Sequence, residues 1–226
     1  CDANLFKEKF PDIKLIKSKE NLGFAGGNNL GIEHTIGEYI LLLNSDTELI
    51  ENSIKTSLDF YKSQNNIGAL SCKLIFPDGK YQSVAQRFPS IKYKLIELFR
   101  IQKFMSKQKA GKLLLGAFFD HNETVEVDWV WGAFFMFKKS LLNKLPNNKL
   151  YDEYFMYWED VQWCYDFVQL GYKNYYLATT KIVHKMGGSS GKKNELMEVN
   201  GESFMRKNFK SFKINFIKNI DRLLIK

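Results

Sequence analysis

The residues best suited to chemistry follow the most apolar run of the chain. That run occupies residues 38–43, and Asn44, Ser45 and Asp46 come directly after it. In an open α/β sheet, ligands bind beyond the carboxyl ends of the strands. A carboxylate there suits a divalent cation, because Mg²⁺ takes one or two protein carboxylates and leaves its other positions to phosphates and water. The alternative is that residues 44–47 cap the following helix, and the spacing leaves both interpretations open.

A second group of candidates lies in Asp152–Asp160, where four acids stand among four aromatic residues. A solvated surface would not hold so many large aromatics, and a core segment would not hold so many acids. The combination suits a sugar, which offers apolar C–H faces to aromatic rings and hydroxyls to carboxylates. An Asp at the start of the next helix could serve as a general base. Capping and ordinary packing are the alternative. Two indoles upstream, Trp129 and Trp131, suit either a core or an acceptor platform.

Two weaker signals are a Gly-rich segment and a histidine. Asn21–Asn29 precedes a predicted helix, and backbone amides at a helix N-terminus suit an anion. The segment matches neither the phosphate-loop pattern nor the dinucleotide-binding pattern, so a plain turn is the alternative. His184 precedes a Gly-rich loop at Gly187–Lys193. Its position suits a metal or phosphate contact, and the alternative is a structural histidine.

The hydrophobic pattern predicts the elements that position these residues. Apolar runs and alternation predict strands at Asp12–Lys17, Glu38–Leu43, Ile67–Phe76, Tyr81–Arg87, within Glu126–Phe137 and at Tyr172–Leu177. Three- and four-residue spacing predicts helices at Asn29–Ile36, Glu51–Ser63, Ile91–Met105, Glu159–Leu170 and Glu195–Lys226. The two strands around Pro77–Lys80 are expected to form a hairpin. The alternation of strands and helices predicts an α/β layered fold with a mainly parallel sheet.

Composition narrows the class of protein. Hydrophobic residues make up 45% of the 226 and charged residues 26%, which is typical of a globular chain. The net charge is +8, but residues 92–112 and 206–226 each carry seven basic residues and one acid. Those two segments hold +12 and leave −4 elsewhere, which disfavours a uniformly basic nucleic-acid coat. No apolar run approaches the ~18–20 residues of a membrane-spanning helix. Three cysteines form no disulfide framework, which favours a reducing compartment.

The motifs, taken in order, resemble the rhamnosyltransferase-like branch of the family 2 glycosyltransferases, which have the GT-A fold. The resemblance covers roughly residues 10–190. It is carried by residues 21–31, 42–47, 128–133 and 151–160, followed by Gly171-Tyr172 and Ile182-Val183-His184.

The resemblance implies a role for each candidate residue. Asp46 and His184 would hold Mg²⁺ or Mn²⁺ against the diphosphate of the donor. Asp160 would be the catalytic base, with Glu159 as its catalytic neighbour. The residues implied at the acceptor are Trp131, Trp158 and Glu159, and those implied at the nucleotide sugar are Gly26, Gly27, Asn28, Asn29, Asn44 and Asp46.

The implied reaction is metal-dependent, inverting transfer from a nucleoside-diphosphate sugar to a hydroxyl of a glycan or lipid-linked glycan. The setting expected for it is bacterial cell-envelope polysaccharide synthesis in the cytoplasm. Residues 1–190 would be the catalytic domain, and residues 191–226 a basic amphipathic extension suited to the anionic inner face of the plasma membrane. An oligomer is a further expectation, and a nucleic-acid partner is not expected. The alternatives are a nucleotide-sugar or glycan-binding fragment without turnover, a membrane-surface interaction module and, less well supported, a glycoside hydrolase.

The sequence departs from the family pattern at three places. Gln162 stands where a second Asp is usual after the Glu-Asp pair, and Ser45 stands where Pro is common. Neither change removes an implied catalytic group. The family also opens with a strand, a helix and a second strand whose Asp reads the nucleotide base. These elements are expected to precede residue 1, and without them the sheet would have an unpaired edge.

Overall fold

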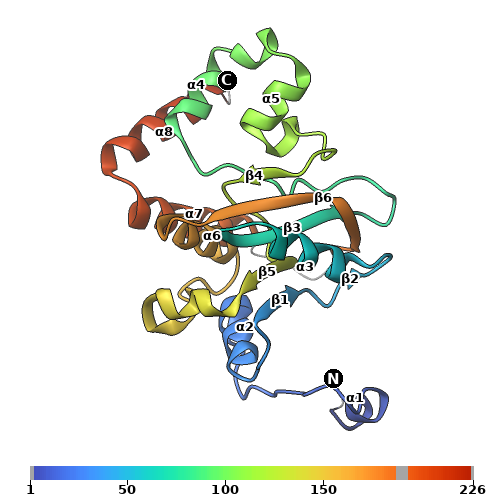
Figure 1. The fold of residues 1–226 in the computed structure, drawn as a ribbon. Helices are drawn as coiled ribbons and strands as arrows, with labels where there is room; N and C mark the ends of the chain where they lie inside the picture. The colour runs from blue at the N-terminus through green and yellow to red at the C-terminus, as the bar shows by residue number, and fades with distance from the viewer. Residues whose placement is uncertain (1–2, 187–192, 225–226) are drawn as a thin grey trace.

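The computed structural model describes residues 3–186 and 193–224, arranged around one mixed sheet (Figure 1). The sheet has six strands in the order β1-β5-β3-β6-β2, and β4 pairs with β6. The strands are β1 (Tyr39–Leu43), β2 (Thr47–Glu48), β3 (Ile67–Ile75), β4 (Val125–Val127), β5 (Phe134–Lys138) and β6 (Lys173–His184). Most of the predicted Gly187–Lys193 loop lies outside the described residues.

The α/β fold class is confirmed, but the sheet is mixed and not mainly parallel. Among the described residues β3 and β6 form the one parallel pair, and the pairings of β1 with β5, β3 with β5, β2 with β6 and β4 with β6 are antiparallel. The reason is β5, which enters the sheet between β1 and β3 and runs against both. Its four residues Phe134–Phe137 are all buried, as expected for a strand covered on both faces.

Eight α-helices are described, and two of them support the middle of the sheet. They are α1 (Ala3–Lys9), α2 (Gly23–Glu33), α3 (Ser53–Ser63), α4 (Ile91–Leu98), α5 (Lys107–Leu114), α6 (Glu159–Gln169), α7 (Lys193–Asn208) and α8 (Ser211–Leu224). Helices α3 and α6 both pack against β3 and β6. A short 3₁₀ turn, η1 (Ile101–Phe104), joins α4 to α5.

Three predicted elements are wrong in detail. Residues 12–17 form no strand. The predicted strand Tyr81–Arg87 is reduced to isolated bridges, one of which joins Ile75 to Tyr81. The Gly-rich segment Asn21–Asn29, expected to precede its helix as a loop or turn, is itself largely helix, because α2 begins at Gly23. Its buried residues Ala25, Asn29 and Ile32 recur at four- and three-residue spacing, so one apolar face overrides the low helix propensity of the glycines.

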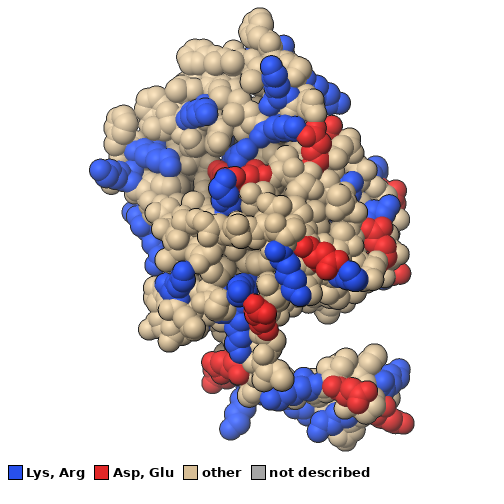
Figure 2. Space-filling model, in the orientation of Figure 1, with Lys and Arg blue, Asp and Glu red and all other residues tan. Residues whose placement is uncertain are grey.

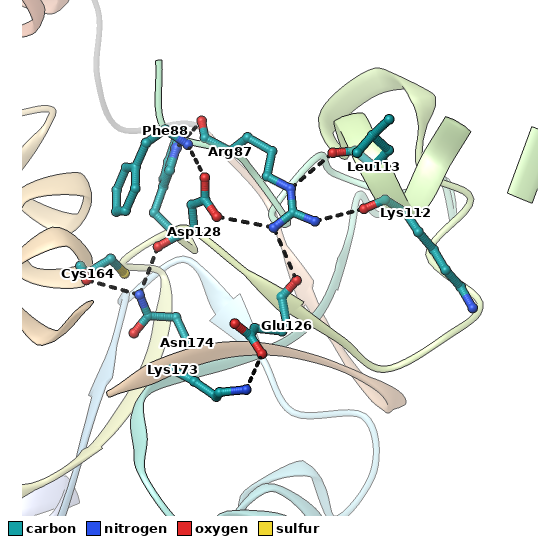
Figure 3. A network of polar contacts seen from close by, with 10 residues as sticks. Arg87, Phe88, Lys112, Leu113, Glu126, Asp128, Cys164, Lys173 and Asn174 are labelled. Carbon is teal, nitrogen blue, oxygen red and sulfur yellow. Dashed lines mark hydrogen bonds and ion pairs between the residues drawn. The ribbon is translucent and has the colours of Figure 1, made fainter. Parts of the chain in front are cut away.

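A buried polar network ties the sheet to helix α6 (Figure 3). Asn174 accepts the amide hydrogen of Ala69 at 2.9 Å and donates to the carbonyls of Asp128 at 2.8 Å and Cys164 at 3.0 Å. One fully buried side chain therefore connects β6 with β3, α6 and the segment before β5. Buried polar groups need such partners, because leaving one unpaired is costly.

We predict that Asn174→Ala lowers the free energy of unfolding by about 1–3 kcal/mol for each buried group that loses its partner. The amide of Ala69 and the two carbonyls would lose the side chain that now bonds them. Urea unfolding followed by circular dichroism measures the change. The control is Asn122→Ala, which alters an exposed residue. Equal stability of the two variants would contradict the prediction.

Candidate active site

The pairing of β2 with β6 brings Asp46 and His184 together. Thr47 lies opposite His184 in that pairing, and Lys185 donates its amide to the carbonyl of Asp46 at 2.9 Å. His184 Nε2 then lies 3.4 Å from Asp46 Oδ1. The sequence separates these residues widely, and the antiparallel β2–β6 ladder alone makes them neighbours. The predicted pair at the end of β1 is thus assembled in the structure.

Gln82 fixes which nitrogen of His184 faces Asp46. Its Nε2 donates to the backbone carbonyl of His184 at 2.7 Å, so its Oε1 is left as the acceptor, 2.8 Å from Nδ1 of the ring. Nδ1 must therefore carry the proton, and Nε2 keeps its lone pair. Burial lowers the pKa of His184 and outweighs the opposite effect of Asp46. The ring is consequently neutral at neutral pH.

This geometry fits two ligands of one divalent cation. Ligand atoms about 2.1 Å from a shared cation lie about 3.0–3.4 Å apart for octahedral to tetrahedral angles, and the observed separation is 3.4 Å. Asp46 is partly exposed, so its carboxylate is open to solvent beside the buried ring. Within the described parts of the chain, no group of three or more His, Cys, Asp or Glu side chains is placed to hold a metal. Substrate oxygens and water would have to complete the shell.

Asp160 sits in the first turn of α6 and is held by two backbone amides. Its Oδ2 accepts from the amide of Gly132 at 2.9 Å, and its Oδ1 accepts from Val161 at 2.8 Å. A Cβ at position 132 would lie 2.8 Å from the ring of Phe24, so a larger residue than Gly132 would displace that ring. The helix N-terminus adds a favourable dipole for the carboxylate.

Glu159 and Asp160 divide one negative charge between them. Burial, together with the charge of Asp160, raises the pKa of Glu159 to about 8, and burial raises the pKa of Asp160 to about 6 despite its two amide bonds. Oε2 of Glu159 is buried and has no hydrogen-bond partner among the described residues. The group with amide donors keeps the charge more easily. At neutral pH the arrangement therefore gives a charged Asp160 beside a protonated Glu159.

The Gly132-Ala133 dipeptide links these two clusters. Gly132 donates to Asp160, and the carbonyl of Ala133 accepts the amide of Asn44 at 3.0 Å. The carbonyl of Asn44 in turn accepts hydrogen bonds from the backbone amide of Thr47 at 3.2 Å and from its hydroxyl at 2.6 Å. One short stretch of backbone thus spans from the acidic pair to the turn that carries Asp46.

The turn before α6 is strained and is held by α7. Tyr157 and Trp158 have φ of 70° and 73°, in the left-handed region that favours glycine. Asn200 of α7 donates to the carbonyls of Met156 at 2.9 Å and Tyr157 at 3.2 Å. Gly201 lets the Trp158 ring lie against α7, where a Cβ would meet that ring at 2.7 Å. Helix α7 therefore takes part in building the turn that carries the acidic pair.

Of the glycines and asparagines of α2 predicted at the nucleotide sugar, some line a cavity and others do not. Gly27 and Asn28 line a cavity of about 390 Å³ between α2 and the free edge of β1. Asn29 is buried and bonded within the chain, donating to the carbonyl of Leu150 and to Asp152 and accepting from the amide of Leu150. Asn29 therefore anchors α2, and its contact with the donor stays a prediction. Gly26 does not line this cavity, and a Cβ there would lie 2.9 Å from Leu22.

The two predicted acceptor indoles are both partly buried. Trp131 precedes the glycine that binds Asp160 and packs at the border of the main core. Trp158 packs against Phe204 of α7, with ring centroids 5.3 Å apart. Gln82 and Asn200 were not found by sequence reasoning. Both are single amides without a motif, and only the fold brings them to His184 and to the strained turn.

The mixed sheet, with acidic side chains beyond the end of β1 and at the start of α6, has the GT-A-like α/β fold. The same fold is found in the solved structure described as GalNAc-T7 with UDP, GalNAc and Mn²⁺, with a TM-score of 0.55, 13% identity and coverage of 84% of this chain and 36% of that one. The chain belongs to glycosyl transferase family 2, whose family model matches residues 3–145. Asp160 lies beyond the matched residues.

Curated relatives are distant and longer. The low-salt glycan biosynthesis hexosyltransferase Agl10 of Haloferax volcanii is 26% identical over 68% of this chain and 46% of its own length. The N-acetylglucosaminyl-diphospho-decaprenol L-rhamnosyltransferase of Mycobacterium tuberculosis is 23% identical over 82% of this chain and 62% of its own length. The chain thus spans about half to three fifths of the length of these two relatives.

We predict that Gln82→Leu releases the tautomer of His184 and lowers Mn²⁺ affinity about 10–100-fold, the usual effect of losing a hydrogen bond behind a metal-binding histidine. Two-bond ¹H–¹⁵N spectra report the protonated ring nitrogen, and calorimetry reports Mn²⁺ binding. Gln64→Leu, at an exposed glutamine, is the matched control. The assignment fails if the ring stays protonated on Nδ1 and the affinity is unchanged in Gln82→Leu.

Proposed function

We propose that this chain is the catalytic part of an inverting, metal-dependent glycosyltransferase. It would move a sugar from a nucleoside-diphosphate donor to a hydroxyl of a glycan or lipid-linked glycan. The observation that carries the proposal is the Gly132-Ala133 backbone, which joins an amide-held carboxylate, Asp160, to the turn that bears Asp46. A base and a cation site in fixed relation are the two parts that such a transfer needs.

Asp160 is the proposed base. A sugar transfer by direct displacement develops oxocarbenium character at the anomeric carbon, as glycoside hydrolysis does. The attacking hydroxyl loses its proton to a carboxylate on the face opposite the leaving group, and inversion follows from that geometry. The pKa of Asp160 is raised to about 6, which makes it a stronger base than an ordinary Asp. This pKa is still below neutral pH, so the carboxylate is mostly deprotonated there. Protonated Glu159 is the proposed donor of a hydrogen bond to the acceptor.

Asp46 and His184 are the proposed ligands of Mg²⁺ or Mn²⁺. The cation would act as a Lewis acid that offsets the charge gathering on the departing nucleoside diphosphate. Gln82 keeps Nε2 of His184 available for it. Gly27 and Asn28 are proposed at the nucleotide sugar, because they line the cavity beside β1. Trp131 is proposed at the acceptor, because it adjoins the glycine that binds Asp160.

The names of the two relatives support this class of substrate. One relative is named a hexosyltransferase of glycan biosynthesis and another a rhamnosyltransferase acting on a diphospho-decaprenol-linked sugar. We propose a polyprenol-diphosphate-linked sugar as the acceptor class, made at the cytoplasmic face of a bacterial membrane. We also propose residues 1–190 as the catalytic domain and 191–226 as an extension, whose helix α7 holds the strained turn through Asn200.

We predict that Asp160→Asn lowers kcat about 10²–10⁴-fold, the usual contribution of a positioned base, and leaves the KM for donor nearly unchanged. Transfer is measured with radiolabelled UDP-, GDP- and dTDP-sugars, Mn²⁺ and a short N-acetylglucosaminyl-diphospho-prenol. Glu153→Gln is the control, because Glu153 is an exposed acid of the same segment. Near-normal turnover of Asp160→Asn would show that another group is the base.

The same assignment gives a pH dependence. The pKa of Asp160 is raised to about 6, so the carboxylate is lost by protonation as the pH falls through that value. We predict that kcat/KM is highest near pH 7 and falls about tenfold per pH unit below pH 6. It falls again above about pH 8, where Glu159 loses the proton that it donates to the acceptor. A profile with no acid limb between pH 5 and 7 would contradict the role of Asp160 but not the metal site.

Loss of the Asp46 carboxylate should weaken the binding of the nucleoside diphosphate, whether or not transfer takes place. We predict that Asp46→Ala weakens Mn²⁺-dependent nucleoside-diphosphate binding by more than about tenfold, or about 1.4 kcal/mol, and that EDTA has the same effect on the unaltered chain. Calorimetry with and without Mn²⁺ measures both. Glu48→Ala is the control, since Glu48 is exposed and pairs with Lys185. Equal nucleotide affinity with and without Mn²⁺ would remove the metal from the proposal.

A further inference from the structure

Two basic segments that are far apart in the sequence form one lobe in the structure. Helices α4 and α8 pack against each other, and Lys94 of α4 pairs with Asp221 of α8 at 2.7 Å. With η1 and α5 they make up the basic lobe, defined here as residues 91–114 and 211–224, at the top of Figure 1. Its two parts hold seven and three basic residues against one acid each, which gives +8. The lobe therefore carries the whole net charge of the chain.

The lobe also exposes large apolar side chains. Phe104 is 90% exposed, Phe99 66%, Phe212 73% and Leu223 58%. In α8 the buried side is formed by Ile214, Ile217 and Ile220. Phe212, Phe216 and Leu223 fall within about 40° of one another on a second stripe at 100° per residue. Packing against α4 thus uses one apolar face of α8 and leaves another uncovered.

Unpaired cations surround these apolar side chains. Arg100, Lys103 and Lys107 alternate with Ile101 and Phe104 along the turn after α4. Arg222 precedes Leu223 at the end of α8. None of these four cations has an acidic partner within 4.0 Å in the described part of the chain, whereas Lys94 and Lys112 are paired. Figure 2 shows lysine and arginine side chains spread over this end of the molecule.

We propose that the basic lobe docks on an anionic lipid bilayer, with its exposed phenylalanines and Leu223 entering the headgroup–acyl boundary. Apolar side chains rimmed by free cations are the combination that binds such an interface. A second copy of this chain is disfavoured as the occupant, since two lobes of +8 repel each other. The phosphates of a nucleic acid would form ion pairs with the cations, but they would offer no apolar surface to the exposed Leu and Ile side chains. No helix described here is long and apolar enough to cross a bilayer. The contact that we propose is with the bilayer surface.

Hydrogen bonds of Arg87 connect the lobe to the segment that leads to Gly132. Docking of the lobe would therefore also position the site. Arg87 donates to the carbonyls of Leu113 and Lys112 at 3.1 and 2.8 Å, at the end of α5 (Figure 3). It also pairs with Asp128 at 3.1 Å, at the head of the segment that leads to Gly132. A docked lobe would hold Asp160 at a set height above the membrane, which suits a lipid-linked acceptor. That consequence rests on the proposed function, but the docking itself does not.

Vesicle co-sedimentation tests the docking without any substrate. The full chain is mixed with vesicles of phosphatidylcholine alone, or of two parts phosphatidylcholine and one part phosphatidylglycerol. We expect binding to the anionic vesicles, weak binding to the neutral ones, and loss of binding as salt screens the cations. Equal binding to both vesicles, or none to either, would overturn the proposal. Tighter binding to a DNA duplex than to anionic vesicles would overturn it in favour of nucleic acid.

Two combined variants locate the contact on the lobe. One reverses three cations, with the changes Arg100→Glu, Lys103→Glu and Lys107→Glu. The other removes three exposed rings, with the changes Phe99→Ser, Phe104→Ser and Phe212→Ser. We expect each to lower the partition coefficient onto anionic vesicles at least about tenfold. The substitutions are all at exposed positions, and thermal melting checks that the fold is kept.

The matched control reverses the same number of charges at the opposite end of the molecule, in and after α1 (Figure 1). Its changes are Lys7→Glu, Lys9→Glu and Lys17→Glu. A control that loses as much binding as the lobe variants would show that total charge, and not the lobe, sets the affinity. Loss of binding in the lobe variants with transfer to a detergent-dispersed acceptor unchanged would separate docking from catalysis.

Discussion

The peptide backbone of Gly132 and Ala133 sets the relation between the two halves of the site. Gly132 donates to the carboxylate of Asp160, and Ala133 accepts from Asn44, two residues before Asp46. Both bonds use main-chain groups at the entry to β5, a strand buried on both faces. Main-chain groups on a packed strand move little, because a shift of β5 would disturb the core on each side. The proposed base and cation site are therefore positioned by the core of the protein.

The turn before α6 is a further constraint, because its backbone conformation is unfavourable in free energy. Tyr157 and Trp158 each hold a conformation that costs of order 1–3 kcal/mol for a residue with a side chain. Asn200 bonds two carbonyls of this turn, and Gly201 leaves room for the Trp158 ring. Gly23 approaches the same segment from α2, where a Cβ would lie 2.2 Å from the carbonyl oxygen of Phe155. Close packing from two helices thus offsets a strain that orients the acidic pair.

The sequence predicted what local periodicity controls. The strand β1, the helix α3 and the helix α6 each lie within two residues of their predicted bounds, because apolar spacing and flanking polar residues mark them. The prediction failed where distant pairing decides. The antiparallel entry of β5 beside β1 depends on contacts such as Tyr39 with Lys138, which no local pattern encodes. The glycines of α2 indicated a loop, although its buried face made it a helix. Asp46 and His184 were found through their motif, whereas Gln82 has none.

The charge distribution connects the site to the basic lobe. The lobe holds +8, equal to the net charge of the chain, so the remaining residues are neutral in sum. The lobe's lysines and arginines lie on α4, η1, α5 and α8, and none of them is among the proposed ligands.

The site itself presents Asp46, Asp160 and Glu159, all acids. A nucleoside diphosphate is an anion and would be repelled by these carboxylates at short range. A divalent cation between Asp46 and the diphosphate reverses that repulsion, and burial keeps Glu159 neutral by raising its pKa to about 8. For the proposed donor, the acidity of the site is thus an electrostatic argument for a bound cation.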